Sequence, residues 1–138
     1  MGRGLVPALP LTEVRARAAS ALAPSSEADA DVLFDYPDAV TPPALVLTWD
    51  EPWLEAETMG PCLFGARFAV LAVVARIEPA IGPLEELIGF VVNRMVADAY
   101  SWPVALVQAP RWMEFGGVKL LGARIVYRVQ VTTNGGTP

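Results

Sequence analysis

Carboxylates are the side chains of this sequence whose clustering could support chemistry. Two acidic groups stand close together along the chain: Asp50, Glu51, Glu55 and Glu57, and further upstream Asp29, Asp31 and Asp35. Such groups can bind calcium or carry out acid–base catalysis. Neither spacing fits a calcium loop, because the glycine and the distal glutamate of that motif are missing. A solvated loop is the commoner role of such a group, and we expect no metal site.

The sequence contains no histidine. Its absence removes the commonest general base and zinc ligand, and it excludes every Ser-His or Cys-His nucleophile. Cys62 is the one cysteine, so no internal disulfide can form, and nothing activates its thiol. The pairs Gly116-Gly117 and Gly135-Gly136 lack the strand-to-helix context and the lysine of a phosphate loop. We expect a non-enzymatic protein with no catalytic residue and no cofactor.

Composition indicates one domain with apolar surface to spare. The 138 residues are 54% hydrophobic and 18% charged, and typical domains are about 45–50% apolar and about 25% charged. Part of the excess should lie in contacts between chains. The net charge of −5 argues against a broad basic surface for nucleic acid. The longest apolar run is bracketed by Arg67 and Arg76 and is too short to span a bilayer.

Periodicity predicts the elements that position these residues. A first helix is expected over residues 12 to 23, with Thr12 as its N-cap and Val14, Ala18 and Leu22 on one face. A short strand over 32 to 36 leads to a proline-rich loop, 37 to 43. A second strand follows over 44 to 49, and an acidic loop comes after it. Residues 1 to 10 and 132 to 138 should be extended or flexible.

Residues 64 to 77 predict the longest strand, and from 68 to 75 both of its alternating faces are apolar. A second helix is expected over residues 83 to 99, beginning at Pro83. One face of that helix is apolar: Leu84, Leu87, Ile88, Val91 and Met95. Two final strands, 104 to 109 and 119 to 131, are joined through the Gly116-Gly117 region. In the last strand apolar residues alternate with Arg124, Arg128 and Gln130, so one face should be buried.

The order α-β-β-β-α-β-β predicts an α+β fold, a mostly antiparallel sheet of about five strands with two helices packed on one face. Two helices cover only one side of such a sheet. The second face of strand 68 to 75 therefore needs another cover. A neighbouring copy could supply it, or the 37 to 43 loop or the N-terminal segment could fold over it, and the sequence favours neither.

Aromatic residues in expected loops are candidates for contact with other chains. Trp53 falls within the acidic loop, and Trp112 and Phe115 flank Met113 in the connection before the last strand. Phe90 lies on the side of the second helix opposite Ile88 and Val92. Large apolar side chains of this kind are over-represented at interfaces, although packing over the edge of the core is the ordinary alternative.

Together these elements resemble the tail terminator proteins of long-tailed, siphovirus-type bacteriophages, above all those of actinobacterial phages. The resemblance covers about residues 10 to 131. It rests on the first helix and on four stretches: VLFDYPDAVTPPALVL, GARFAVLAVVARI, PLEELIGFVVNRMVADA and GVKLLGARIVYRVQV. None of these is a catalytic fingerprint. They are a pattern of elements that spans a single tail-terminator-like domain.

The resemblance implies a structural protein of the virion neck, assembled in the host bacterial cytoplasm. A ring, usually a hexamer, would cap the tail tube and join it to the head connector. Its partners would be copies of itself, the tail tube protein and the head–tail connector (stopper) protein. DNA would pass through without specific binding, and no membrane would be involved.

Asp50, Glu51, Glu55 and Glu57 are then the candidate channel lining, because a negative wall repels phosphates. Changing all four to lysine should slow DNA release and leave folding intact. Two alternatives remain open. The chain could be another head–tail connector or tail tube ring component, or a small cellular ligand-binding α+β domain with a pocket between helix and sheet.

Overall fold

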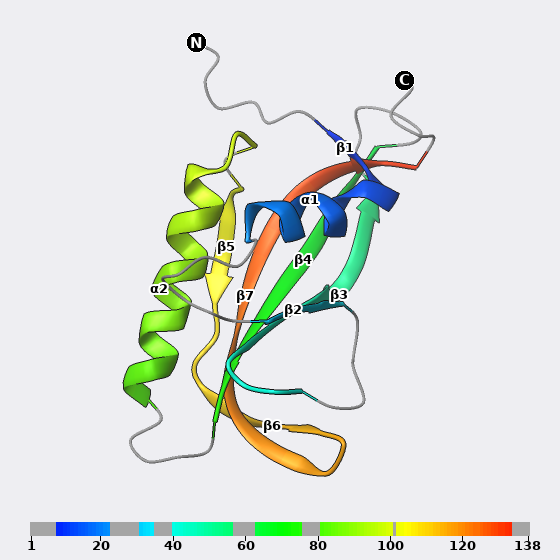
Figure 1. The fold of residues 1–138 in the computed structure, drawn as a ribbon. Helices are drawn as coiled ribbons and strands as arrows, with labels where there is room; N and C mark the ends of the chain where they lie inside the picture. Colours follow the sequence, from blue (N-terminus) through cyan, green and yellow to red (C-terminus); the bar gives the residue numbers. More distant parts are fainter. Residues whose placement is uncertain are drawn as a thin grey trace.

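The chain forms an α+β fold in the computed structural model, which describes residues 8–22, 31–34, 40–56, 63–75, 81–100 and 102–133. A mostly antiparallel seven-stranded sheet carries two α-helices (Figure 1). The elements in chain order are β1 (Leu9–Pro10), the 3-10 helix η1 (Leu11–Glu13), α1 (Val14–Ala21), β2 (Asp31–Phe34), β3 (Ala44–Ala56), β4 (Leu63–Val74), α2 (Ile81–Ala97), β5 (Val104–Val107), β6 (Arg111–Phe115) and β7 (Val118–Thr132).

The sheet is built around β4 and β7. Its strand order is β1-β7-β4-β3-β2, and β5 and β6 also pair with β7. The β3–β4, β4–β7, β5–β7 and β6–β7 pairs are antiparallel, whereas β2–β3 and β1–β7 are parallel. The fold class is as expected from the sequence, but the expected order lacks β1 and β6. Two residues are too few to show a period, and β6 was interpreted as a connection.

β6 and β7 form a hairpin through Gly116 and Gly117. Both glycines have positive φ, 58° and 84°, as a tight two-residue hairpin turn requires. Strand pairing runs from Phe115 opposite Val118 to Arg111 opposite Gly122. The Gly-Gly turn therefore joins β6 to β7 directly, and β5 precedes the hairpin.

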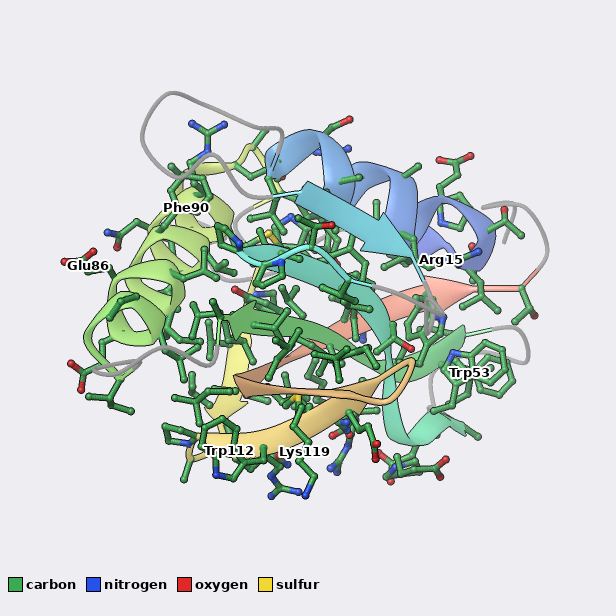
Figure 2. All side chains as sticks on the ribbon, turned by 60° about the horizontal axis from the view of Figure 1, so that its bottom comes forward. Arg15, Trp53, Glu86, Phe90, Trp112 and Lys119 are labelled. Atoms are coloured by element: carbon green, nitrogen blue, oxygen red, sulfur yellow. The ribbon has the colours of Figure 1, made fainter. Side chains whose placement is uncertain are left out.

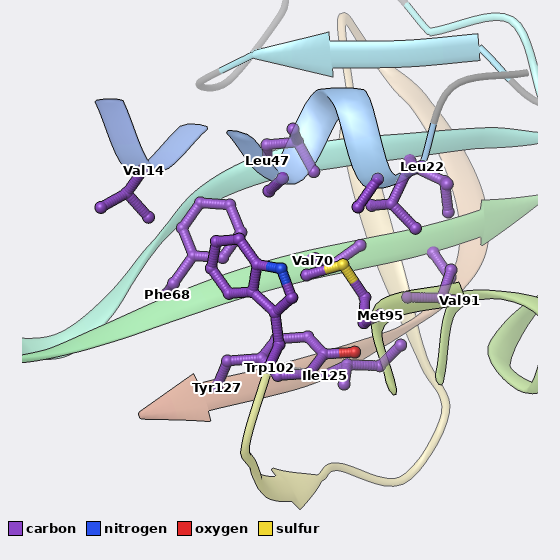
Figure 3. Packing of buried hydrophobic residues seen from close by; sticks show 14 of the residues in the cluster. Val14, Leu22, Leu47, Phe68, Val70, Val91, Met95, Trp102, Ile125 and Tyr127 are labelled. Atoms are coloured by element: carbon purple, nitrogen blue, oxygen red, sulfur yellow. The ribbon is translucent and has the colours of Figure 1, made fainter. Parts of the chain in front are cut away.

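A helix-side core lies between the sheet and the two helices (Figure 3). The buried residues of α1 are Val14, Ala18 and Ala21, followed by Leu22, and those of α2 are Leu84, Leu87, Val91 and Met95. They pack against Leu45 and Leu47 of β3, alternate residues of β4, and Ala123, Ile125, Tyr127 and Val129 of β7. The expected apolar faces of both helices and the expected buried face of the last strand are confirmed.

The helix ends differ from the sequence expectation. Thr12 lies in η1, and no side chain caps the start of α1, where Glu13 occupies the N-cap position. α2 is described from Ile81 onward, so Pro83 is its third residue. Glu85 and Glu86 therefore lie beyond the first turn, where a helix dipole would have favoured them most. For α1, burial of the apolar face and not a side-chain cap is what fixes the helix.

Both faces of β4 are buried, as the sequence predicted. On the face away from the helices lies a hairpin-side core: Ala44, Val46, Leu71, Val73, Phe115 and Leu120. The β6–β7 hairpin supplies much of its cover, and Val40 from the proline-rich stretch and Met113 pack beside it. A Cβ added at Gly122 would lie 2.7 Å from Val73 Cγ1 and 2.9 Å from Met113 Sδ. The hairpin is packed tightly, so a neighbouring copy is not needed to bury this face.

Trp102 is the centre of a buried aromatic cluster, with ring centroids 4.7 Å from Tyr100, 5.7 Å from Phe68 and 6.2 Å from Tyr127. The Tyr127 hydroxyl is buried without a hydrogen-bond partner among the described residues, and the buried Tyr100 hydroxyl has only the Gln130 backbone near it, without a hydrogen bond of good geometry. Burial raises the pKa of Tyr100 from 10.0 to about 12, against the lowering influences of Arg17 and of the Gln130 backbone, and burial also raises the pKa of Tyr127. Both phenols are therefore held neutral in the folded chain.

We expect the folded state to lose stability in alkali. In the unfolded chain both phenols ionise near their ordinary value of 10.0. The stability contribution is therefore complete below about pH 10 and is lost as the pH rises toward the folded-state pKa values. Denaturant unfolding between about pH 8 and about pH 11.5 measures this loss. Tyr127→Phe removes one phenol and should flatten the decline; equal declines in the two proteins would contradict the assignment.

Candidate functional site

The acidic stretch, residues 50 to 57, is not a loop over its described part. Asp50, Glu51 and Glu55 lie in β3, and Glu57 is outside the described residues. The register between β3 and β4 shifts between Trp49 and Leu54, so the strand bulges here. β2 pairs only with residues 44 to 47 of β3. Beyond that point β3 has no neighbour on its β2 side among the described strands, and a sheet edge tolerates Pro52.

Two of the acidic side chains pair with arginines of the same chain. Arg124 Nη1 donates to Asp50 Oδ1 at 2.5 Å, and Arg128 Nη1 donates to Glu55 Oε1 at 3.1 Å. Arg67 Nη2 lies 4.0 Å from the same Glu55 oxygen. The Asp50 side chain is 13% exposed, whereas that of Glu55 is 44% exposed. Since exposed pairs contribute little, the Asp50–Arg124 pair has the larger structural effect.

These pairs change the electrostatics expected of the acidic stretch. Asp50 and Glu55 lie beside Arg67, Arg124 and Arg128, so these side chains and Glu51 together form a mixed patch with a formal charge of zero (three negative and three positive). A dense negative surface is not what these side chains form. The channel-lining role of Asp50, Glu51, Glu55 and Glu57 stays a prediction. The repulsion of DNA phosphates on which it rests is weaker than expected, because neighbouring arginines offset the carboxylates.

The four candidate aromatic contacts occupy different places. Trp53 and Trp112 are 47% and 51% exposed, and Figure 2 shows them apart, on β3 and β6. Phe90 is half-buried on α2, with the Arg94 guanidinium carbon 5.7 Å from its ring centroid. Phe115 is only 6% exposed and belongs to the hairpin-side core. It is therefore packed inside this chain, contrary to the expectation of a contact with another one.

Trp53 is braced by other rings. Its centroid lies 5.6 Å from that of Trp49, which in turn lies 5.4 Å from Phe68. Phe68 contacts the buried Trp102, so one row of rings runs from the surface into the helix-side core. An exposed tryptophan held in this way loses little conformational freedom on binding, a property of interface anchors.

β5 is far more exposed than its sequence pattern indicated. All four of its residues are exposed, and Val104, Leu106 and Val107 are 40%, 43% and 45% exposed. It pairs with β7, and no other described strand pairs with it. Its flanking residues Pro103 and Pro110, together with the absence of charge between them, were the available signal, because proline in strands is confined to edges.

A polar cluster ties the end of α2 to α1. Asp98 Oδ2 accepts hydrogen bonds from the Tyr100 backbone N–H at 3.0 Å and from Trp102 Nε1 at 3.1 Å, and it lies 3.9 Å from Arg17 Nε. Arg94 Nε donates to the Ala21 carbonyl at 3.3 Å. A hollow of about 290 Å³ lies beside these groups. Because their polar atoms bond within the chain, the cluster positions Trp102 and the helices.

The described residues hold no group of three or more potential metal-ligating side chains. No helix in the described part is long and apolar enough to cross a membrane. No protein-family model matches the chain, and no curated protein matches it. The two exposed tryptophans and the edge strand β5 are therefore the features on which a function can be argued.

Proposed function

We propose that this chain is a non-enzymatic structural protein of a phage virion, a ring-forming tail terminator that caps the tail tube and joins it to the head connector. The observation that carries the proposal is the edge strand β5, whose four residues are exposed and which pairs with no described strand other than β7. An apolar sheet edge is a liability in a protein that stays single. In an assembly the same edge is a contact surface.

The action we propose is geometric. A closed ring presents one rim to the last ring of the tube and the other to the connector, and occupying the growing end prevents further addition of tube subunits. Trp53 and Trp112, which lie apart (Figure 2), suit contacts with different neighbours. The mixed-charge patch suits a surface that DNA passes without specific contact. The protein would act in the virion neck after assembly in the bacterial cytoplasm.

The packing favours this proposal over a ligand-binding domain. Such a domain would need a pocket between helix and sheet, and that space is occupied by the side chains of the helix-side core (Figure 3). Phe68, Trp102 and Tyr127, the largest fully buried side chains among the described residues, are packed together there. A different connector or tube component would also form a ring, and the identity of the ring's neighbours separates it from a terminator.

We expect electron microscopy of the concentrated protein, or of the neck of a particle that contains it, to show a closed ring. The free chain can be monomeric when dilute, because a single short interface is weak. Light scattering over a range of concentrations should therefore show a mass that rises toward one limiting multiple. A neck with one isolated copy per particle would reject the proposal.

A further inference from the structure

We infer that the ring closes by edge pairing, in which β5 of each copy adds to β2 of the next and continues the sheet around the ring; this rests on the proposed function. Among the described strands, β2 pairs only with β3 at one edge of the sheet, and β5, like β1 and β6, pairs only with β7 at the other. Each has four residues, so their backbone groups can pair end to end. Pairing of two different edges is a head-to-tail contact, the kind that generates a ring.

The strand directions suit this pairing. β2 runs parallel to β3, β3 antiparallel to β4, and β4 antiparallel to β7, so β2 and β7 run the same way. β5 is antiparallel to β7 and thus also to β2. Rotation about an axis to which the strands are tilted, as in any sheet that closes on itself, keeps these directions. The β5 of one copy therefore meets the β2 of the next in the antiparallel arrangement, which is the slightly more stable one.

The faces of the two strands also agree. Val32 lies opposite Leu45 and packs against the helix-side core. Val107 lies opposite Ile125, a residue of that core, so it is on the same face, whereas Leu106 lies opposite Val126 and is on the other. Within one sheet Val107 is level with Phe34, through Ile125, Val70 and Leu47. Pairing Val107 with Val32 of the next copy shifts the contact by two residues, which keeps the helix-covered faces continuous and matches strands that are tilted to the ring axis. A slip of one residue would reverse this match.

Charge on the two helices supports a second copy as the occupant. α2 packs against β4 and β7 and so lies toward the β5 edge, and α1 packs against β3 and so lies toward the β2 edge. Edge pairing would bring α2 of one copy beside α1 of the next. α1 carries Arg15 and Arg17 and no acid, and Arg17 stays 41% exposed although it lies 3.9 Å from Asp98 of its own chain, while α2 exposes Glu85 and Glu86. Figure 2 shows Glu86 and Arg15 on different sides of the molecule. The acidic side chains of α2 would then lie near the basic side chains of α1 in the next copy. A contact between two α1 helices or two α2 helices would instead bring like charges together.

Disulfide trapping tests the pairing directly. In a Cys62→Ser background, Val32→Cys combined with Val107→Cys should give, on oxidation of the concentrated full chain, a ladder of linked multimers that dithiothreitol reverses. Val32→Cys combined with Leu106→Cys is the matched control, because its two positions lie on opposite faces, and it should lose the ladder. One pair of engineered cysteines links more than two copies only if each copy contacts one neighbour through β5 and another through β2, as in a head-to-tail arrangement.

Three results would overturn the inference. The first is linked dimers from Val107→Cys alone, which would show that β5 pairs with itself. The second is equal ladders from the test and control pairs. The third is the absence of a ladder in samples whose micrographs show rings. In the last case the ring, and with it the proposed function, would stand. A ladder without any closed ring would instead support edge pairing and contradict the proposed function.

Discussion

Leu87→Asp or Val91→Asp should unfold the domain. Leu87 is 5% exposed and Val91 fully buried, and both belong to the helix-side core beneath α2. Neither new carboxylate would have a partner there, and an unpaired buried charge costs several kcal/mol in addition to the lost packing. Domains of this size have about 5–15 kcal/mol of stability in total. We therefore expect either variant to lose its cooperative thermal transition and to accumulate in the insoluble fraction.

Val96→Asp is the matched control for these variants. Val96 lies on the same helix but is 54% exposed, so the same substitution leaves the carboxylate in water. Because Val96 lies in the last turn of α2, where an acid opposes the helix dipole, the variant's free energy of unfolding should fall by no more than about 1 kcal/mol. A soluble, cooperatively folded Val91→Asp variant would show that this face of α2 is not packed on the sheet.

Asp50→Lys should have the second largest effect, and it corrects the sequence-based expectation that lysines in the acidic stretch leave folding intact. The new cation would face Arg124 in a half-buried site, where Asp50 is 13% exposed and Arg124 26% exposed. Losing the ion pair and adding like-charge repulsion should cost about 2–4 kcal/mol, less than for a fully buried pair. The thermal midpoint should fall by roughly 10 °C.

A charge swap separates the ion pair from other effects of the substitution. Asp50→Arg combined with Arg124→Asp restores opposite charges and should recover most of the stability lost in either single variant, a coupling that a double-mutant cycle measures. Glu51→Lys is the control within the same strand, since Glu51 is exposed, and it should change stability by less than about 0.5 kcal/mol. Additive losses in the swap would mean that the two charges do not interact.

The same variants show how the channel-lining role of the acidic stretch can be tested. DNA release is a fair readout of charge only in variants that fold and assemble normally. Glu51→Lys meets that condition, whereas Asp50→Lys would slow release through damage to the sheet. If Glu51 lines the channel, its replacement should slow DNA release at unchanged particle yield. A normal release rate would remove Glu51 from the lining.

Local periodicity predicted much of the fold. The apolar spacing of Leu84, Leu87, Val91 and Met95 gave α2 and its buried face, and the unbroken apolar run of β4 gave a strand buried on both sides. The alternation in β7 gave its orientation. In each case a repeat along the chain corresponds to one side of an element, so no knowledge of neighbours is needed.

Contacts between distant residues decided the rest. The cover over the second face of β4 comes from the β6–β7 hairpin, whose strand β6 has charged and exposed residues and no clear alternation. Asp50 is paired by Arg124, 74 positions away, which turns an apparent acidic loop into a mixed-charge part of β3. Trp102 is buried against rings from β4 and β7, and Asp98 accepts its N–H.

The sequence by itself therefore determined which elements form and which of their sides are apolar. Only the tertiary structure decided which charges meet, which aromatic rings remain outside, and that β5 is left at an uncovered edge. The physical reason is that periodicity is a property of neighbouring residues. Ion pairing, register and edge position depend on which strands lie side by side. The neighbours of each strand are fixed only when the sheet forms and packs against the helices.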